Sequence, residues 1–200
     1  MMAKLRLVLW GAVFVLGAFL AYSTVTWSLK GDVTNIARVQ IGGPFEAQDT
    51  KGNPFTQQAM MGRPHIVFFG FTHCPDVCPT TLYETTQWLE KLGEDGKKID
   101  AYFVTVDPKR DTAKVMDDYL TPFQPGIKGI TGTEEQIAAL SKLWRVYAEK
   151  VPLEDDDYTM NHTATTYLMN ADGAFFGTIA YGENADSAVQ KLKRLLDAQS

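Results

Sequence analysis

An apolar run that ends in a pair of cysteines places the strongest constraint on the fold of this chain. Residues 65–71 read HIVFFGF, and Gly62-Arg63-Pro64 precede them. A short apolar run next to turn residues predicts a central strand that is buried on both faces of a sheet. The segment CPDVCP at residues 74–79 follows at once, and residues 81–92 then show helical spacing. We therefore expect both cysteines to lie where a buried strand gives way to a helix.

The rest of the chain alternates between strand and helix patterns. Lys51-Gly52-Asn53 and Asp172-Gly173 are favoured turn sequences, and each lies between two short apolar segments. Thr133 and Gln136 resemble a capping box at the start of a helix. The predicted order is hairpin 44–56, strand 65–71, helix 81–92, strand 101–106, helix 109–120, short strand 129–132, helix 133–151, hairpin 165–180 and helix 185–196. This order predicts an α/β fold of three layers, with helices on both faces of the sheet.

The first thirty residues predict a membrane anchor. Residues 8–22 are apolar and uncharged, and with their flanks they reach the about 20 residues that a bilayer span needs. Lys4 and Arg6 precede this run, so the N-terminus should stay inside and the rest of the chain outside. A cleaved signal peptide is the alternative, because it has the same basic start. Either segment delivers the chain to a compartment that tolerates disulfides.

These features divide the chain into an anchor at residues 1–29, a linker at 30–43 and a domain at 44–200. The short N-terminus lacks an Arg/Ser-rich presequence, which favours a bacterial inner membrane over a mitochondrial one. We therefore expect a single-pass protein whose domain lies in the periplasm.

The charge balance excludes nucleic acid as a partner. The chain has 19 basic and 24 acidic residues and a formal net charge of −5. Three of the basic residues and none of the acidic ones lie in residues 1–30, so the remainder is more acidic still. Phosphate binding needs a basic footprint, which this composition lacks.

The two cysteines of the chain, Cys74 and Cys78, are too close in sequence to staple a fold. A thiol at the start of a helix meets unpaired backbone N–H groups, which lower its pKa and favour the thiolate. Side chains four residues apart on a helix lie about 5–6 Å apart at Cβ. The pair can therefore bind a metal or close to a disulfide.

His162 is the histidine that could complete a metal site. It lies in the segment MNHTA at residues 160–164, which we expect to form a loop beside the cysteines. An exposed loop histidine is the equal alternative on these grounds. Two thiolates and one imidazole form a soft ligand set that favours Cu(I), whereas an added oxygen ligand would suit Cu(II) or Zn(II). A structural zinc site is not expected, because it usually needs a second cysteine pair.

Several other polar residues have alternative interpretations. His65 reads as a strand-edge residue, and His73 as a group near the metal or a solvated loop residue. Asp76 could adjust the charge at the site or favour the helix start. Residues 107–112 could form a functional loop, or Asp111 or Thr112 could cap the following helix. The acidic run 154–157 is typical of a solvated loop. Met160 could be an extra soft ligand or a packing residue.

Five segments resemble the SCO/SenC/PrrC family. They are FTHCPDVCP at residues 71–79, VDPKRDT at 106–112, TGT at 131–133, YAEKV at 147–151, and His162-Thr163 before the YLMNADG hairpin. The resemblance extends over residues 40–195. It implies a thioredoxin-like fold, an N-terminal anchor, and copper bound through Cys74, Cys78 and His162.

The resemblance also implies partners. Members of this family help to assemble cytochrome c oxidase by delivering copper to the dinuclear centre of subunit II. The resemblance also suggests three other partners: another copper oxidase subunit, a further copper chaperone and a thioredoxin-like reductant. Some members instead reduce disulfides or act as redox sensors.

Residues 165–169, TTYLM, are similar to the TTFLI strand of membrane-tethered thioredoxins. A cis-proline precedes that strand in those proteins, whereas Ala164 takes its place here. The cysteines also lack the two-residue spacing of ordinary disulfide oxidoreductases. We therefore expect a copper carrier rather than an enzyme. The alternative is a thiol–disulfide oxidoreductase in which Cys74 attacks a partner disulfide and Cys78 resolves the mixed disulfide. His162 distinguishes the two functions, because copper binding needs it and dithiol exchange does not.

Overall fold

The computed structural model describes residues 2–31, 40–123, 126–154 and 156–199. The chain divides into two compact units, Met1–Val39 and Gln40–Ser200. Most of the predicted linker, residues 32–39, lies outside the described residues. The division into anchor, linker and domain therefore stays a prediction.

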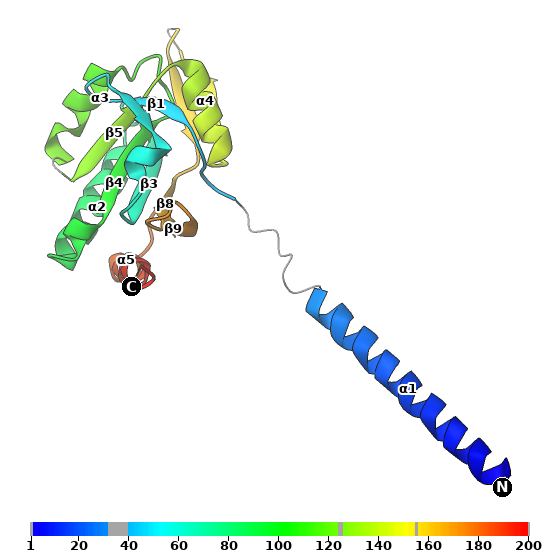
Figure 1. Ribbon diagram of the computed structural model, residues 1–200. Coiled ribbons are helices and arrows are strands. Elements are labelled where there is room, and N and C mark those ends of the chain that lie inside the picture. The colour runs from blue at the N-terminus through cyan, green and yellow to red at the C-terminus, as the bar shows by residue number, and fades with distance from the viewer. Residues whose placement is uncertain (1, 32–39, 124–125, 155, 200) are drawn as a thin grey trace. The chain divides into compact units, whose positions relative to one another are not determined.

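The first unit contains one helix, α1 (Met2–Gly31), drawn in blue in Figure 1. Large apolar side chains along it are exposed, among them Trp10, Phe14 and Phe19. Within the described parts of the chain, no helix combines the length and the apolarity that a membrane crossing requires. The helix is observed, and its role as an anchor stays a prediction.

The second unit alternates strands and helices. Its strands are β1 (Glu46–Asp49), β2 (Pro54–Thr56), β3 (His65–Gly70), β4 (Asp100–Thr105), β5 (Ile127–Thr131), β6 (Ala148–Pro152), β7 (Tyr158–His162), β8 (Thr165–Met169) and β9 (Phe175–Ala180). Its helices are α2 (Val77–Leu92), α3 (Ala113–Leu120), α4 (Glu134–Leu143) and α5 (Ala185–Asp197), with short 3₁₀ turns at Gln57–Met60, Gly96–Lys98 and Thr121–Phe123.

Strand β3 lies inside a seven-stranded sheet of order β2-β1-β5-β4-β3-β8-β9 (Figure 1). The central strands β3, β4 and β5 are parallel, with Phe68 of β3 opposite Phe103 of β4. Antiparallel pairs flank them on both sides, β1 with β5 and β8 with β3. Because parallel strands share a direction, the carboxyl ends of β3 and β4 meet at one edge, and the cysteines follow β3 there.

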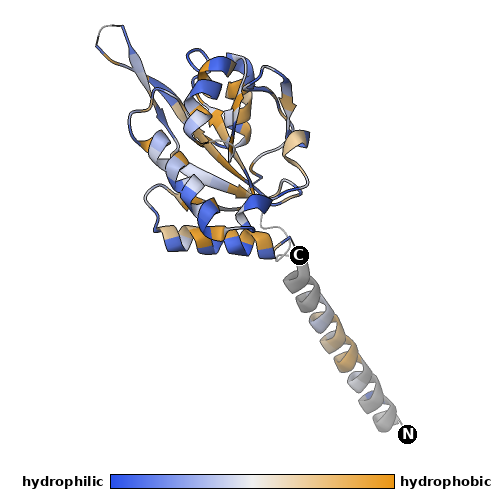
Figure 2. Ribbon diagram, turned by 90° about the vertical axis from the view of Figure 1, so that its left-hand side faces the viewer, coloured by the Kyte–Doolittle hydropathy of each residue, from blue (hydrophilic) through white to orange (hydrophobic). Residues whose placement is uncertain are grey.

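Helices cover both faces of this sheet. All six residues of β3 are buried. On one face Phe68 stacks on Phe103, which in turn contacts Tyr119 of α3. On the other face Phe69 contacts Trp144, the residue that follows α4. The hydrophobic colouring of the central strands in Figure 2 marks this core. The predicted three-layer arrangement is confirmed.

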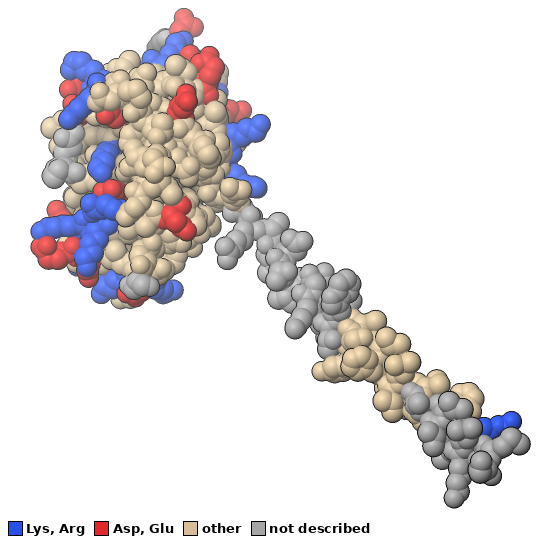
Figure 3. All heavy atoms as spheres, viewed as in Figure 1, with Lys and Arg blue, Asp and Glu red and all other residues tan. Residues whose placement is uncertain are grey.

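Charged residues of both signs are interspersed on the face of this unit seen in Figure 3. Many form exposed ion pairs, such as Lys91 with Asp186 at 2.6 Å and Lys97 with Glu94 at 2.6 Å. Exposed pairs of this kind contribute little to stability. The fold therefore depends mainly on the buried sheet rather than on these exposed ion pairs.

The predicted helix 133–151 is wrong in its second half. Its start is confirmed, because Thr133 and Gln136 form both hydrogen bonds of a capping box. The helix α4 nevertheless ends at Leu143, and Arg145 adopts a left-handed backbone with φ of 54°. Only a few non-glycine residues adopt this conformation, and it cannot continue a right-handed helix. Strand β6 follows and forms a hairpin with β7, in which Ala148 faces His162.

Other boundaries differ less. The helix predicted at 109–120 begins at Ala113, and Thr112 caps it by accepting a hydrogen bond from the Val115 N–H. The short strand predicted at 129–132 begins earlier, as β5. The hairpins at 44–56 and 165–180 are confirmed. Gly52 and Gly173 lie in their turns at φ of 79° and 77°, where glycine is favoured.

Candidate metal centre

Three potential metal ligands from two segments far apart in sequence converge at the carboxyl end of β3. Cys74 lies in the loop after β3, Cys78 in the first turn of α2, and His162 at the end of β7. Their sulfur and nitrogen atoms all lie within 4.8 Å of one another. The Cys78 Sγ is 3.6 Å from the His162 Nε2. The structure thus brings together all three predicted residues, although His162 ends a strand and does not lie in the predicted loop.

The two sulfurs differ in exposure and in acidity. Cys74 is partly exposed, whereas Cys78 is buried. Hydrogen bonds from the Cys78 thiol and from the backbone N–H groups of Asp76 and Cys78 lower the pKa of Cys74 to about 3. The hydrogen bond that the Cys78 thiol donates, together with burial, raises the pKa of Cys78. In the metal-free chain Cys74 is therefore the thiolate and Cys78 holds the proton.

The His162 ring is oriented for ligation. Its Nδ1 lies 3.0 Å from the Thr163 carbonyl oxygen, so Nδ1–H donates there. The lone pair of Nε2 then points toward the sulfurs, the arrangement that fixes the tautomer of a ligating histidine. Phe68 and Phe71 contact the ring edge-on, with centroids at 6.2 and 5.7 Å. Two aromatic side chains from the β3 segment therefore hold the imidazole in place.

Gly70 gives Cys78 its space. A Cβ at this last residue of β3 would lie 2.7 Å from the Cys78 Sγ and 2.7 Å from the Phe103 Cε2. Real Cβ atoms do not approach other atoms so closely, so any side chain here would displace the sulfur. The backbone of β3 at Gly70 therefore packs directly against the Cys78 sulfur.

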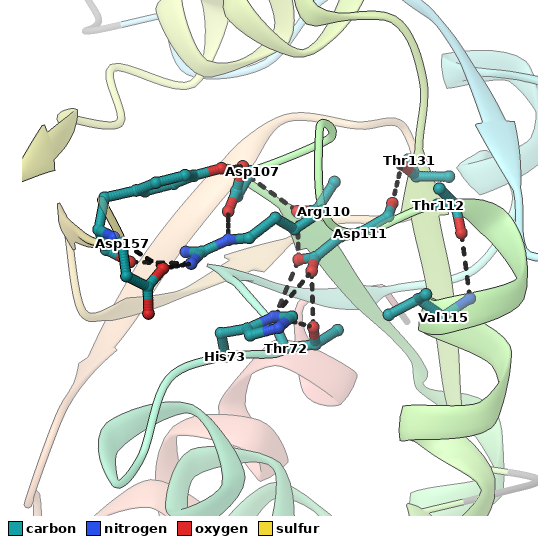
Figure 4. Close-up of polar contacts among 11 residues, drawn as sticks. Thr72, His73, Asp107, Arg110, Asp111, Thr112, Val115, Thr131 and Asp157 are labelled. Atoms are coloured by element: carbon teal, nitrogen blue, oxygen red, sulfur yellow. Dashed lines mark hydrogen bonds and ion pairs between the residues drawn. The ribbon is translucent and has the colours of Figure 1, made fainter. Parts of the chain in front are cut away.

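Asp111 holds the loop that carries the cysteines (Figure 4). Its buried carboxylate accepts hydrogen bonds from the Thr72 N–H at 3.0 Å, from the Thr72 hydroxyl at 2.6 Å and from the Thr105 hydroxyl at 2.6 Å. Burial raises the pKa of Asp111. The prediction that Asp111 or Thr112 caps a helix is confirmed for Thr112, whereas Asp111 binds the Thr72 loop instead.

Arg110, the neighbour of Asp111, holds the hairpin that carries His162. Its Nε donates to Asp107 at 2.5 Å, and its Nη1 donates to the Tyr158 carbonyl at 2.8 Å. The Tyr158 hydroxyl donates to the second oxygen of Asp107 at 2.9 Å. Figure 4 shows Arg110 reaching toward Asp107 and Asp157, whereas Asp111 reaches toward Thr72. The sequence analysis did not predict that Arg110 and Asp111 hold the two segments of the site. The resemblance of the VDPKRDT segment to the family was the one indication that these residues matter.

The remaining candidates lie outside the cluster of three ligands. The side chain of His73 is 53% exposed and lies 4.0 Å from Asp111. His65 is buried at the opposite end of β3, and Met160 packs against the core. Asp76 precedes α2 without a side-chain cap. In the acidic run Asp157 accepts from Arg110 at 3.2 Å, and Asp155 lies outside the described residues.

Comparisons with known proteins agree with this site. The SCO1/SenC family model matches residues 33–197. A SCO2-like protein of Rickettsia felis is 40% identical over 139 residues, which cover 68% of each chain. The mitochondrial protein SCO2 of Saccharomyces cerevisiae is 36% identical over 163 residues. That match covers 80% of this chain and 54% of the yeast protein, so the chain spans about half the length of that relative.

The fold is also similar to a solved structure of Bradyrhizobium japonicum ScoI with copper bound, which is 45% identical to this chain. The TM-score is 0.72, and the match covers 78% of this chain and 99% of that one. This likeness confirms the predicted thioredoxin-like α/β fold. With its family model and its relatives in agreement, the chain belongs to the SCO1/SenC family.

Proposed function

We propose that this protein is a copper carrier that binds the ion through Cys74, Cys78 and His162 and delivers it during cytochrome c oxidase assembly. The observation that carries the proposal is the convergence of the three ligand atoms within 4.8 Å. The Nδ1–H bond to Thr163 leaves Nε2 free to bind a metal. Copper is the cargo in this scheme and leaves with the partner.

The chemistry of the ligands favours copper over other metals. Two sulfurs and one imidazole nitrogen form a soft set of low coordination number, which suits Cu(I); an oxygen ligand would complete a site for Cu(II). The copper-bound ScoI structure of Bradyrhizobium japonicum supports the same ion. Partial exposure of Cys74 leaves one ligand accessible, so copper can pass to a partner by stepwise exchange of ligands.

The proposed partner is subunit II of cytochrome c oxidase or another copper oxidase subunit. We place the chain in a bacterial inner membrane, with α1 as the anchor and the second unit in the periplasm. The uncharged run at residues 8–22 and the exposed apolar side chains of α1 support this placement. The basic residues Lys4 and Arg6 before the run support the orientation.

Titration with Cu(I) tests the proposal directly. The full-length chain, reduced and free of oxygen, is titrated against a competing chelator beside His162→Ala and the matched control His73→Ala. We expect one tight equivalent for the wild-type chain and for the His73 variant, and much weaker binding for His162→Ala. Equal affinities for all three chains would remove His162 from the site and contradict the proposal.

A second function, thiol–disulfide exchange, is favoured by the unequal cysteines. The pKa of Cys74 is lowered to about 3 and the pKa of the buried Cys78 is raised, as in an attacking and a resolving thiol. The Cys74 thiolate would attack a partner disulfide and release one partner thiolate. Cys78, on losing its proton, would then attack the mixed disulfide, leaving the partner reduced and a Cys74–Cys78 disulfide. Rapid reduction of a model disulfide by His162→Ala, together with weak copper binding by the wild-type chain, would make this the leading function.

A further inference from the structure

The hairpin that carries His162 stands apart from the large sheet. Strands β6 and β7 pair with each other, and among the described residues they share no ladder with the seven-stranded sheet. Tyr158, Met160 and His162 alternate along β7 and therefore lie on one face of it. The position of the His162 ring thus depends on what holds this hairpin against the domain.

One attachment is at the base of the hairpin. The Tyr147 N–H donates to the Thr163 hydroxyl at 3.0 Å, and the Thr163 N–H donates to the Tyr147 carbonyl at 3.0 Å. These bonds close the hairpin on itself at the residue after His162. The orientation of the hairpin toward the cysteines therefore depends on contacts of β7 itself. Phe68 and Phe71 contact the His162 ring, and Met160 packs against the core.

The second attachment is Arg110. Its guanidinium lies 3.7 Å from the centroid of the Tyr158 ring and donates to the Tyr158 carbonyl. Asp107 accepts from both Arg110 and the Tyr158 hydroxyl, so all three side chains are joined. Lys150 of β6 lies over the same tyrosine ring, at 3.6 Å. A planar guanidinium can stack and donate in two directions at once, which an ammonium group cannot.

Arg110 also faces the cysteine side of the site. Its guanidinium lies 5.9 Å from the centroid of the Phe71 ring, and Phe71 contacts the His162 ring edge-on. The next residue, Asp111, binds Thr72 in the loop that leads to Cys74. Two adjacent side chains therefore hold the two halves of the site, one the hairpin and the other the cysteine loop.

We infer that Arg110 is a positioning residue for the copper site: through Tyr158 it fixes the tilt of the β6–β7 hairpin, and thereby the distance of His162 from the cysteines. The inference rests on the proposed copper-binding function. If Arg110 acts through His162, its loss must weaken copper binding only while His162 is a ligand.

A double-mutant cycle tests this coupling. Cu(I) affinity is measured by chelator competition on four full-length chains: wild type, Arg110→Gln, His162→Ala and the double variant. Arg63→Gln is the matched control, since Arg63 also binds backbone carbonyls, those of Lys97 and Lys98, at the opposite end of β3. Loss of a residue that orients a ligand typically weakens metal binding about tenfold or more. We expect about tenfold weaker binding for Arg110→Gln and no further loss in the His162→Ala background.

The cycle separates the two proposals. Equal loss from Arg110→Gln in both backgrounds, or no loss in either, overturns the positioning role and leaves the copper site standing. Unchanged affinity in His162→Ala overturns the three-ligand site itself, and with it the inference about Arg110. If Arg110→Gln does not fold, Tyr158→Leu removes the other side of the same contact from the half-buried face of β7, and the same cycle applies to it.

Discussion

The Cys78 Sγ and the His162 Nε2 lie 3.6 Å apart although 84 residues separate them in sequence. Cys78 is fixed by the first turn of α2, whereas His162 belongs to a hairpin outside the large sheet. The two segments meet through side chains, with Phe71 against the imidazole and Arg110 against Tyr158. The ligand geometry can therefore be disturbed at residues that bind no metal.

The reactivity of Cys74 should be nearly independent of pH. An ordinary cysteine becomes a thiolate only near pH about 8.5, whereas the hydrogen bond from Cys78 lowers the pKa of Cys74 to about 3. In the reduced, metal-free chain the rate of alkylation by iodoacetamide should stay flat from about pH 5 to about pH 8, because the thiolate fraction is already complete. Peptide mapping measures the rate at each cysteine. The chain unfolded in urea is the control, and its rate should rise about tenfold per pH unit. A folded-state rate that rises equally would contradict the lowered pKa.

Asp111→Asn should destabilise the fold and loosen the cysteine loop. The carboxylate accepts three hydrogen bonds, and the amide nitrogen of asparagine would face one of these donors. An unsatisfied buried polar group costs about 1–3 kcal/mol, so the free energy of unfolding in urea should fall by about that amount. Cu(I) affinity should fall with it, because Thr72 precedes Cys74 closely.

Asp95→Asn is the matched control for Asp111→Asn. Asp95 is exposed and contacts Lys98. Its variant should unfold at the wild-type urea concentration and bind Cu(I) equally well. A stable Asp111→Asn chain with wild-type affinity would show that the Thr72 contacts do not hold the loop.

His65 should make the fold sensitive to mild acid. It is 2% exposed, and burial lowers its pKa from an ordinary value of about 6.5. Because the folded state prefers the neutral ring, its stabilising contribution is complete above about pH 6.5 and is lost as the pH falls through the folded-state pKa. The free energy of unfolding of the wild-type chain should therefore fall between about pH 6.5 and about pH 5 more steeply than that of His65→Leu. His73→Leu, at an exposed position, should keep the steep fall; equal slopes for all three chains would refute this assignment.

Local patterns were enough to predict the elements on which the cysteines depend. The apolar run at 65–71 and the helical spacing after it predicted β3 and α2, because burial on both faces and a turn signal are both visible in sequence. The Asp172-Gly173 turn likewise predicted the β8–β9 hairpin, with Gly173 at φ of 77°. The β8–β9 pairing and the loop that carries the cysteines therefore follow from short-range sequence patterns.

The hairpin β6–β7 could not be predicted in this way. Four of the five residues of β6 are exposed, so the strand lacks the alternation by which a half-buried strand is recognised. The apolar spacing of α4 runs on to Tyr147, which is 54% exposed, and the break lies in the backbone of Arg145. The contacts of Arg110 and Asp111 span 48 and 39 residues, and sequence spacing carries no information about such pairs.

Gly70→Ala should move the Cys78 sulfur and so test whether its position matters for copper. The new Cβ would lie 2.7 Å from the Cys78 Sγ and 2.7 Å from Phe103, and overpacking of this kind typically costs about 1–3 kcal/mol of unfolding free energy. Gly177→Ala in β9 is the control, since no atom lies within 4 Å of its Cβ, and its stability should change by less than about 0.5 kcal/mol. Urea unfolding and Cu(I) competition on the same preparations separate the two effects. We expect Gly70→Ala to lose both stability and copper affinity and Gly177→Ala to lose neither. A Gly70→Ala chain could also be less stable and still bind Cu(I) as tightly as the wild type. That result would contradict the prediction, because it would show that the close packing of β3 against Cys78 stabilises the fold without determining the ligand geometry.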